Sequence, residues 1–259
     1  MIHPLGARPD TPDPHDYRYH ARRAAAKVKS GERLLPVRID NRDECTRVRK
    51  QLHSDCVGQA VASIAEFLYW RAMGFPPALS SWAVYRIAQL NDAWPGEEPE
   101  AFGTDLRTAL KEAWAKHGMY PANTWPDGAD APVMAGAAAM ARKFPLRRYE
   151  RICGLWETKH SIHAAGAVLA TVMVTGGWDE PRDGIIRPSM TEEGYHAVML
   201  CGYDDEIGGV WVKNSWGEGW GQKGYARLPY PDFERNVTDV WLPAITNGGW
   251  WAKIAGLFQ

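Results

Sequence analysis

The chain has 259 residues, of which 45% are hydrophobic, and a formal net charge of −1 at pH 7. This length and apolar content suffice for one sizeable core or for two lobes that share a cleft. A net charge this close to zero gives no electrostatic argument for a nucleic acid or a membrane surface as a partner. No apolar run is long enough to span a bilayer, and the first residues lack the charged and then apolar order of a signal peptide. We therefore expect a single soluble domain in the cytoplasm, with export by a route without a cleaved signal left open.

Residues 1–34 differ in composition from the rest of the chain. They are rich in Pro, Asp, Arg and His and contain few large apolar side chains. Such a segment buries little surface of its own and does not form a separate core. We expect a strap along the surface or a short plug in a cleft, and a flexible tail is the alternative.

The stretch from about residue 50 to 146 has the periodicity of helices. Apolar side chains at helical spacing follow Cys56, and Gly74 and Pro76 end that pattern. Serines before the next apolar run are candidate N-caps. The predicted helices cover residues 56–74, 80–90, 104–118 and 130–143, with an acidic loop containing Pro and Gly at residues 92–103.

From about residue 147 the pattern changes to that of strands. Short runs rich in β-branched and aromatic residues are bounded by Gly, Pro or Asp. The predicted strands cover residues 149–153, 167–174, 196–202, 209–213 and 224–228. We therefore predict a helical lobe, about residues 50–146, and a β lobe, about residues 147–246, with a cleft between them.

Three residues that lie far apart in the sequence have the chemistry of a nucleophilic site. Cys56 begins a predicted helix, where exposed amide groups stabilise a thiolate. His196 opens a buried strand and is therefore held rigidly. Asn214 can fix the imidazole tautomer through its carbonyl oxygen without adding a charge. In this order Cys, His and Asn form a candidate catalytic set.

Each of these residues also has a structural interpretation. A buried cysteine is most often a small apolar filler, as we expect for Cys45, Cys153 and Cys201. Four cysteines in a chain of this length do not form a disulfide framework. A zinc-binding site is not indicated by His160 and His163 alone, and we expect neither a metal nor a cofactor. The joint pattern of Cys, His and Asn favours catalysis.

At these residues the sequence resembles the papain family of cysteine peptidases, most closely its compact bacterial and phage-type branch. The order Cys, His, Asn is that of the family. Further likeness lies in residues 12–17, 103–126 and 194–204 and in the run from Lys213 to Tyr225. The resemblance extends from about Leu35 to Leu242. It implies an α+β, two-lobed fold with a helical lobe and an antiparallel β-barrel-like lobe, and a catalytic domain at residues 35–246.

The resemblance also implies roles for individual residues. The protein would be a cysteine-type peptidase that hydrolyses protein or peptide substrates through a covalent acyl-enzyme, with Cys56, His196 and Asn214 as the triad. Trp216 would cover the hydrogen bond between Asn214 and His196. Ala197, together with the strand at residues 167–174, would line the main specificity pocket.

The sequence departs from the family before the nucleophile. The family has a Gln six positions earlier that helps to bind the oxyanion, whereas Lys50 stands there and Gln51 is one residue nearer. Gln51 can serve only if the loop is rearranged, and loss of one such donor costs about 10²–10³ in turnover. Asp55 beside the thiol would raise the thiol pKa. The alternative is therefore a catalytically weak or inactive papain-like module for binding or assembly.

The two ends carry separate predictions. Residues 1–34 are too short for the globular inhibitory propeptide of papain zymogens, which favours the strap or plug. Residues 247–259 place Trp250, Trp251, Ile254, Leu257 and Phe258 near one helical face. That tail would contact a partner or a membrane surface, or pack back on the domain.

Overall fold

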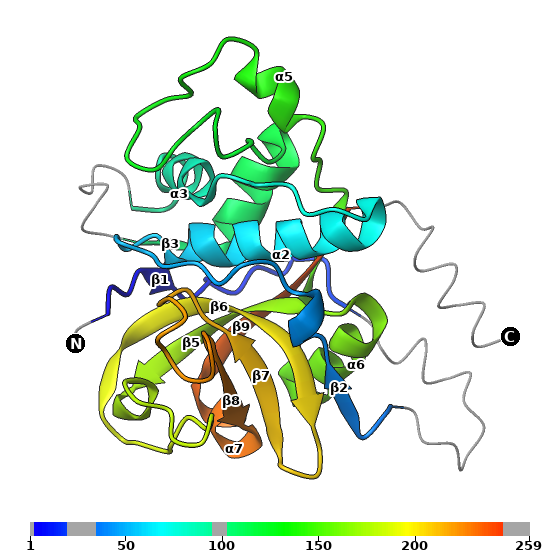
Figure 1. The fold of residues 1–259 in the computed structure, drawn as a ribbon, viewed down its shortest axis with the longest axis vertical. Helices are drawn as coiled ribbons and strands as arrows, with labels where there is room; N and C mark the ends of the chain where they lie inside the picture. Colours follow the sequence, from blue (N-terminus) through cyan, green and yellow to red (C-terminus); the bar gives the residue numbers. More distant parts are fainter. Residues whose placement is uncertain (1–2, 20–34, 95–102, 246–259) are drawn as a thin grey trace, which may run out of the picture.

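The protein was analysed as a computed structural model, which describes residues 3–19, 35–94 and 103–245. Figure 1 shows helices gathered above a curved sheet, with the helix α2 (Cys56–Met73) crossing the middle between them. The predicted tail at residues 247–259, and part of the predicted strap, lie outside the described residues. No helix among the described residues is long and apolar enough to cross a bilayer.

The upper lobe is built from short helices around α2. These are α3 (Ser81–Gln89), α4 (Leu106–Thr108), its π-helical continuation η2 (Ala109–Ala115) and α5 (Ala137–Ala141). Ser80 caps α3, because its hydroxyl accepts the backbone N–H of Ala83 at 3.0 Å. Gly74 ends α2 with φ of 81°, a left-handed conformation that favours glycine.

The lower lobe is a seven-stranded sheet in the order β4-β9-β5-β6-β7-β8, and β2 pairs with β6. Its strand pairs are all antiparallel. The strands are β2 (Arg38–Asp40), β4 (Arg148–Ile152), β5 (Val168–Thr175), β6 (Glu192–Asp204), β7 (Gly209–Lys213), β8 (Tyr225–Pro229) and β9 (Val237–Ala244). The helices α6 (Gly154–Ala165) and α7 (Tyr230–Asn236) and the 3-10 turns η1 (Arg42–Glu44) and η3 (Gly176–Trp178) complete the described lobe.

Apolar burial explains the position of α2. Residues Cys56 to Phe67 are all buried, so this part of the helix has no solvent-exposed face of the kind that a surface helix shows. One core joins α2, the other upper helices and the inner face of the sheet. A second core fills the sheet's other side. The first turn of α2 is thereby fixed against β6 at the border of the two lobes.

Several sequence predictions were wrong in detail. The Ala-rich helix predicted for residues 130–143 is only α5, because Gly136 precedes it with φ of 76°, a conformation outside the helix. The helices α6 and α7 and the strand β9 were not predicted. The helix α6 follows β4 after only Cys153 and β9 follows α7 directly, whereas Pro229 and Pro231 at the start of α7 were a helix-start cue that the sequence analysis missed.

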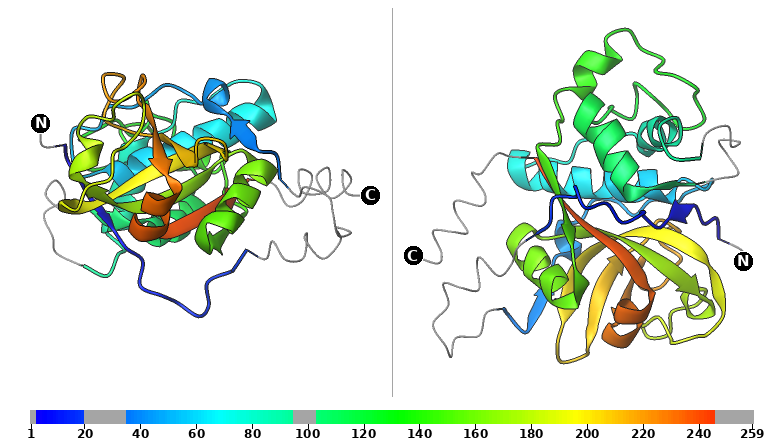
Figure 2. Two further views of the ribbon diagram at one scale, coloured as in Figure 1. Left: turned by 90° about the horizontal axis from the view of Figure 1, so that it is seen from below. Right: turned by 180° about the vertical axis from the view of Figure 1, so that it is seen from behind.

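The amino-terminal residues 3–19, which we call the strap, run between the two lobes (Figure 2). The strand β1 (Ala7–Arg8) pairs in parallel with β3 (Thr104–Asp105) of the upper lobe. The Thr104 N–H donates to the Gly6 carbonyl at 3.0 Å, and the Tyr19 N–H donates to Arg151 in β4 at 2.9 Å. The strap therefore crosses the border where α2 begins.

Candidate active site

The Cys56 sulfur lies at the first residue of α2 and is fully buried. The backbone groups of Ala197, Gly6 and Val57 each act to lower the pKa of the thiol. Burial nevertheless dominates, and with the nearby charge of Asp55 it raises the pKa of the Cys56 thiol to about 12. In this closed arrangement the sulfur is a protonated thiol.

His196 lies within β6 and directly precedes Ala197, whose backbone is one of the groups that act on the Cys56 thiol. Its Nε2 is 2.8 Å from the Asn214 Oδ1, which also accepts the backbone N–H of Ser215 at 2.7 Å. The second bond identifies that atom as the oxygen, so Nε2 must carry the proton in the neutral ring. The Nδ1 atom has no hydrogen-bond partner among the described residues and is left as the free base.

The imidazole is as buried as the thiol. Burial lowers the pKa of His196 to about 4, although the hydrogen bond to Asn214 opposes this shift. A neutral imidazole beside a neutral thiol is the resting form of this closed site. Opening the site to water would remove burial, which is the main cause of the raised pKa of Cys56 and of the lowered pKa of His196.

Aromatic rings surround the contact between His196 and Asn214. Trp216 lies 4.8 Å from the His196 ring, centroid to centroid, and packs edge-on against Trp178 at 6.2 Å and Trp220 at 5.7 Å. Trp178 is itself 6.4 Å from His196. The predicted cover by Trp216 thus lies within a larger indole cluster, whose member Trp178 the sequence pattern did not mark.

Gln51 also lies at the site, on the chain that leads into α2. Its Oε1 accepts the Ser215 hydroxyl at 2.5 Å, and its Nε2 donates to the carbonyls of Pro4 at 2.9 Å and His53 at 3.0 Å. Three such contacts fix the amide orientation. Lys50 forms an isolated bridge with Trp216 instead, so the shortened loop directs Gln51, and not Lys50, inward.

Asp55 occupies the N-cap position of α2 without capping it. Its Oδ2 accepts the Gln59 amide at 2.6 Å, and burial raises its pKa to about 6. The effect of this carboxyl on the thiol has the direction that the sequence predicted.

The strap covers the whole constellation. His3 stacks on Trp216 with ring centroids 4.2 Å apart and the rings 5° from parallel. Pro4 accepts from Gln51, and the Gly6 backbone acts to lower the pKa of the Cys56 thiol. A Cβ placed on Gly6 would lie 1.9 Å from the Ser54 carbonyl oxygen, so only glycine fits there.

Ala197, predicted to line the specificity pocket, lies within β6. It is buried and pairs with Thr171 of β5. Leu5 of the strap approaches the position where a Cβ on Gly194 would stand, at 3.1 Å. An open hollow of about 720 Å³ lies beyond His3, lined by Gly177, Asp179 and Arg187 among others. The strap thus contacts Trp216 through His3 and Gln51 through Pro4.

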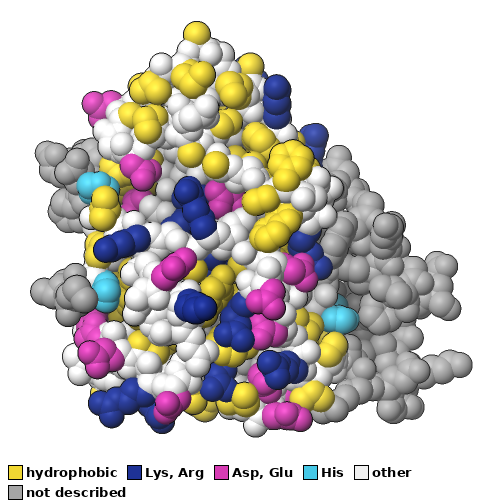
Figure 3. All heavy atoms as spheres, viewed as in Figure 1, with side chains coloured by type: hydrophobic (Ala, Val, Ile, Leu, Met, Phe, Trp, Pro, Cys, Tyr) yellow, Lys and Arg dark blue, Asp and Glu magenta, His cyan; other side chains and the backbone are white. Residues whose placement is uncertain are grey.

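Other groups offer little alternative chemistry. The described residues contain no cluster of three or more His, Cys, Asp or Glu that could hold a metal. All four cysteines are free. On the face shown in Figure 3, basic and acidic side chains are interspersed, and no field of one sign stands out.

Comparison with known proteins supports the resemblance. Residues 146–237 match the profile of the papain family cysteine protease. A cathepsin L-like protein of Caenorhabditis elegans is 58% identical over 41 residues, 15% of this chain and 12% of that protein. Vignain of Ricinus communis is 42% identical over 60 residues, 22% of this chain and 15% of that protein. The chain thus matches only a small part of the length of these curated relatives.

Solved structures extend the likeness to the whole fold. Xylellain, a cysteine protease from Xylella fastidiosa, superposes with a TM-score of 0.79 at 21% identity, over 95% of this chain and 97% of that chain. Digestive procathepsin L2 of Tenebrio molitor gives a TM-score of 0.68 at 20% identity, over 89% and 74%. The predicted papain-like α+β fold is confirmed.

Proposed function

We propose that this chain, a papain-like protein by its fold and by the sequence of its β lobe, is a cysteine peptidase that cleaves peptide bonds in protein substrates. The observation that carries the proposal is the orientation of His196. Its Nε2 is held by Asn214 at 2.8 Å, and its unpaired Nδ1 is left for the thiol proton. A nucleophile, a base and a group that orients the base are the requirements of covalent catalysis.

The reaction follows from these groups. The Cys56 thiol gives its proton to His196 Nδ1 as the sulfur bonds to the substrate carbonyl carbon, which makes a tetrahedral oxyanion. The oxyanion collapses, the C–N bond breaks, and the amine leaves with the proton from the imidazolium. Water then attacks the thioester, gives a proton to the imidazole and releases the acid, and the thiol is restored.

Gln51 is the proposed donor to the oxyanion. Its Nε2 already donates to a carbonyl oxygen, that of Pro4, at 2.9 Å. A substrate carbonyl that replaced Pro4 would meet the same donor. Hydrogen bonds of this kind stabilise developing charge best where water is excluded. The buried surroundings of Gln51 supply that condition.

The strap is proposed to act as a plug that keeps the enzyme latent. Two of its features make it a blocker and not a substrate. The Gly6 backbone acts on the thiol as a donor, lowering its pKa, and a donor N–H cannot be attacked; the carbonyl held by Gln51 belongs to another residue, Pro4. The closed site also disfavours the thiolate, because the pKa of Cys56 is raised to about 12.

Hydrolysis of an internally quenched peptide library tests the proposal. We expect cleavage by the Gly6→Ala variant, whose strap no longer fits, and none after Cys56→Ala is added. Mass spectrometry of the products would identify the bonds that are cut. Absence of cleavage by Gly6→Ala, together with an unreactive Cys56, would favour the binding or assembly module instead.

A further inference from the structure

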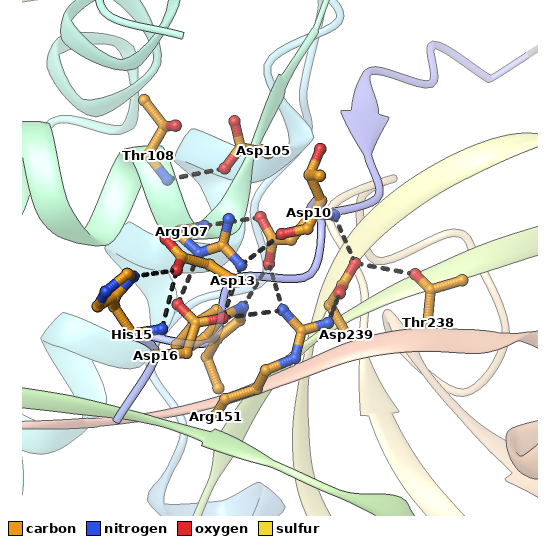
Figure 4. Close-up of polar contacts among 12 residues, drawn as sticks. Asp10, Asp13, His15, Asp16, Asp105, Arg107, Thr108, Arg151, Thr238 and Asp239 are labelled. Atoms are coloured by element: carbon orange, nitrogen blue, oxygen red, sulfur yellow. Dashed lines mark hydrogen bonds and ion pairs between the residues drawn. The ribbon is translucent and has the colours of Figure 1, made fainter. Parts of the chain in front are cut away.

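A buried polar cluster holds the middle of the strap between the two lobes (Figure 4). Carboxyl groups outnumber guanidinium groups in it, which is unusual for a buried contact. We call it the carboxyl cluster. Its members are Asp10 and Asp16 of the strap, Asp105 of β3, Arg107 of α4, Arg151 of β4 and Asp239 of β9.

Each arginine of the carboxyl cluster has a carboxylate of its own. Arg107 donates twice to Asp16, from Nε at 2.8 Å and from Nη2 at 2.6 Å. Arg151 donates to Asp239, and its Nη1 also lies 3.5 Å from Asp16. The guanidinium groups of Arg107 and Arg151 are thus each bonded to a carboxylate other than Asp10. Asp10 is left without a dedicated positive partner.

Asp10 is buried in the carboxyl cluster with two N–H donors and no close guanidinium partner. Its fully buried carboxyl accepts the Trp241 indole N–H at 2.6 Å and the backbone N–H of Arg107 at 3.2 Å. The carboxyl of Asp105 is a second acidic group that acts on it, in the direction that favours a proton on Asp10. The nearest guanidinium atom, Nη1 of Arg151, is 3.8 Å away.

The electrostatic environment of Asp10 also favours the protonated carboxyl. Burial, the hydrogen bond to Asp105 and the negative charge of Asp239 raise the pKa of Asp10 to about 8, although Trp241 opposes the shift. Asp10 docks its backbone as well, since its N–H donates to Asp239 at 2.9 Å. Asp10 is therefore both the residue that binds the proton and a residue that anchors the strap through its backbone.

We propose that Asp10 enters the carboxyl cluster as a neutral carboxylic acid, so that the strap takes up a proton when it closes and is released as the pH rises. The carboxyl cluster then works as a proton-dependent latch on residues 3–19. Its effect on turnover rests on the proposed peptidase function. The docking of the strap does not.

The direction follows from proton linkage. In a released strap Asp10 would have its ordinary pKa near 3.8 and be ionised at neutral pH, whereas the docked residue keeps its proton. Its contribution to docking is thus complete below about pH 4 and is lost as the pH rises through about 8. Within that window the docking constant falls about tenfold per pH unit. Above about pH 6.5, where His3 and His196 are neutral whether the strap is docked or released, a rise in pH would therefore open the site.

Hydrogen–deuterium exchange of the full chain, corrected for intrinsic rates, measures docking without any need for catalysis. We expect protection of peptides from residues 3–19 to fall by about 100-fold between pH 6 and pH 8. Asp10→Asn offers the same acceptor to Trp241 and a permanent N–H donor to Asp105, so its protection should not change with pH. Asp13→Asn, a strap carboxyl outside the carboxyl cluster, is the matched control and should follow the wild type.

A flat wild-type profile between pH 5 and pH 9 would overturn the latch, as would an Asp10→Asn profile that falls like the wild type. Asp105→Asn provides a second variant, because it keeps a group able to cap α4 and removes the acid that shares the proton. Its profile should be shallower than that of the wild type. If Cys56 proved unreactive while these profiles behaved as expected, the peptidase proposal would fail and the latch would stand.

Discussion

The amide of Gln51 donates to the carbonyl of Pro4 at 2.9 Å, across 46 intervening residues of sequence. This contact joins the side chain proposed to stabilise the oxyanion to the strap that covers the nucleophile. The Gln51 amide would therefore bind the strap in the closed state and the substrate oxyanion in the open state. Strap and substrate would compete for it.

Removal of strap contacts should activate the protein. The Gly6→Ala methyl would stand 1.9 Å from the Ser54 carbonyl oxygen, an overlap that costs about 1–3 kcal/mol of docking free energy. We expect the rate of peptide hydrolysis at neutral pH to rise about 5- to 150-fold. Deletion of residues 1–31 should raise it at least as much. Gly219→Ala, where the methyl meets nothing within 4 Å, is the control. Unchanged turnover in Gly6→Ala and in the deletion would rule out a plug.

Asn214→Ala should impair catalysis without abolishing the reactive thiol. It leaves the buried Nε2 of His196 without its acceptor at 2.8 Å, and a buried group without its partner costs about 1–3 kcal/mol. In the Gly6→Ala background we expect kcat/KM to fall about 5- to 150-fold, measured on one peptide substrate. Asn41→Ala removes an amide that bonds the Gly166 carbonyl elsewhere, and should leave kcat/KM unchanged. Equal losses in both variants would point to stability and not to the imidazole.

Gln51→Ala should separate the two roles of that residue. Loss of one oxyanion donor lowers kcat by about 10²–10³. The Pro4 carbonyl loses its partner at the same time, so the strap should become easier to displace. We expect a low kcat together with faster exchange of residues 3–19. Gln51→Glu, similar in size but without the N–H donor, should behave likewise. A kcat close to that of the Gly6→Ala parent would assign the oxyanion to other groups.

Asp55→Asn should stabilise the fold in a pH-dependent way. Burial raises the pKa of Asp55 to about 6, so the group contributes stability that is complete below about pH 4 and is lost as the pH rises through about 6. The amide does not ionise and still accepts from Gln59. We expect a gain on the order of 2–3 kcal/mol at pH 8 and little at pH 4, from thermal unfolding at both pH values. A gain that is equal at both would contradict this cause.

The sequence allowed the central parts of the site to be predicted because each lies in a strong local pattern. Cys56 heads an apolar helical repeat, and His196 begins an apolar run that β6 contains. The aromatic and glycine-rich run after Lys213 is conspicuous in any chain. These features depend on neighbours in sequence, and the structure brings His196 and Asn214 into a hydrogen bond with Trp216 beside them.

What could not be predicted depends on contacts between distant segments. Nothing local in Pro4 or Gly6 indicates that the strap meets Gln51 and Cys56, because the fit arises only when both lobes are in place. Trp178 follows an ordinary strand end, and its role beside His196 is visible only in three dimensions. The protonated state of Asp10 likewise follows from carboxyls contributed by β3 and β9.

The most direct measurement is labelling of Cys56 by an epoxide inhibitor of papain-like enzymes, read by intact mass in the Gly6→Ala variant and in the same variant with Cys56→Ala. The account predicts one adduct at neutral pH that disappears with the cysteine and forms far more slowly after His196→Ala. If no adduct forms while a small thiol reagent still reaches Cys56, the site lacks an activated nucleophile and the proposed peptidase is contradicted.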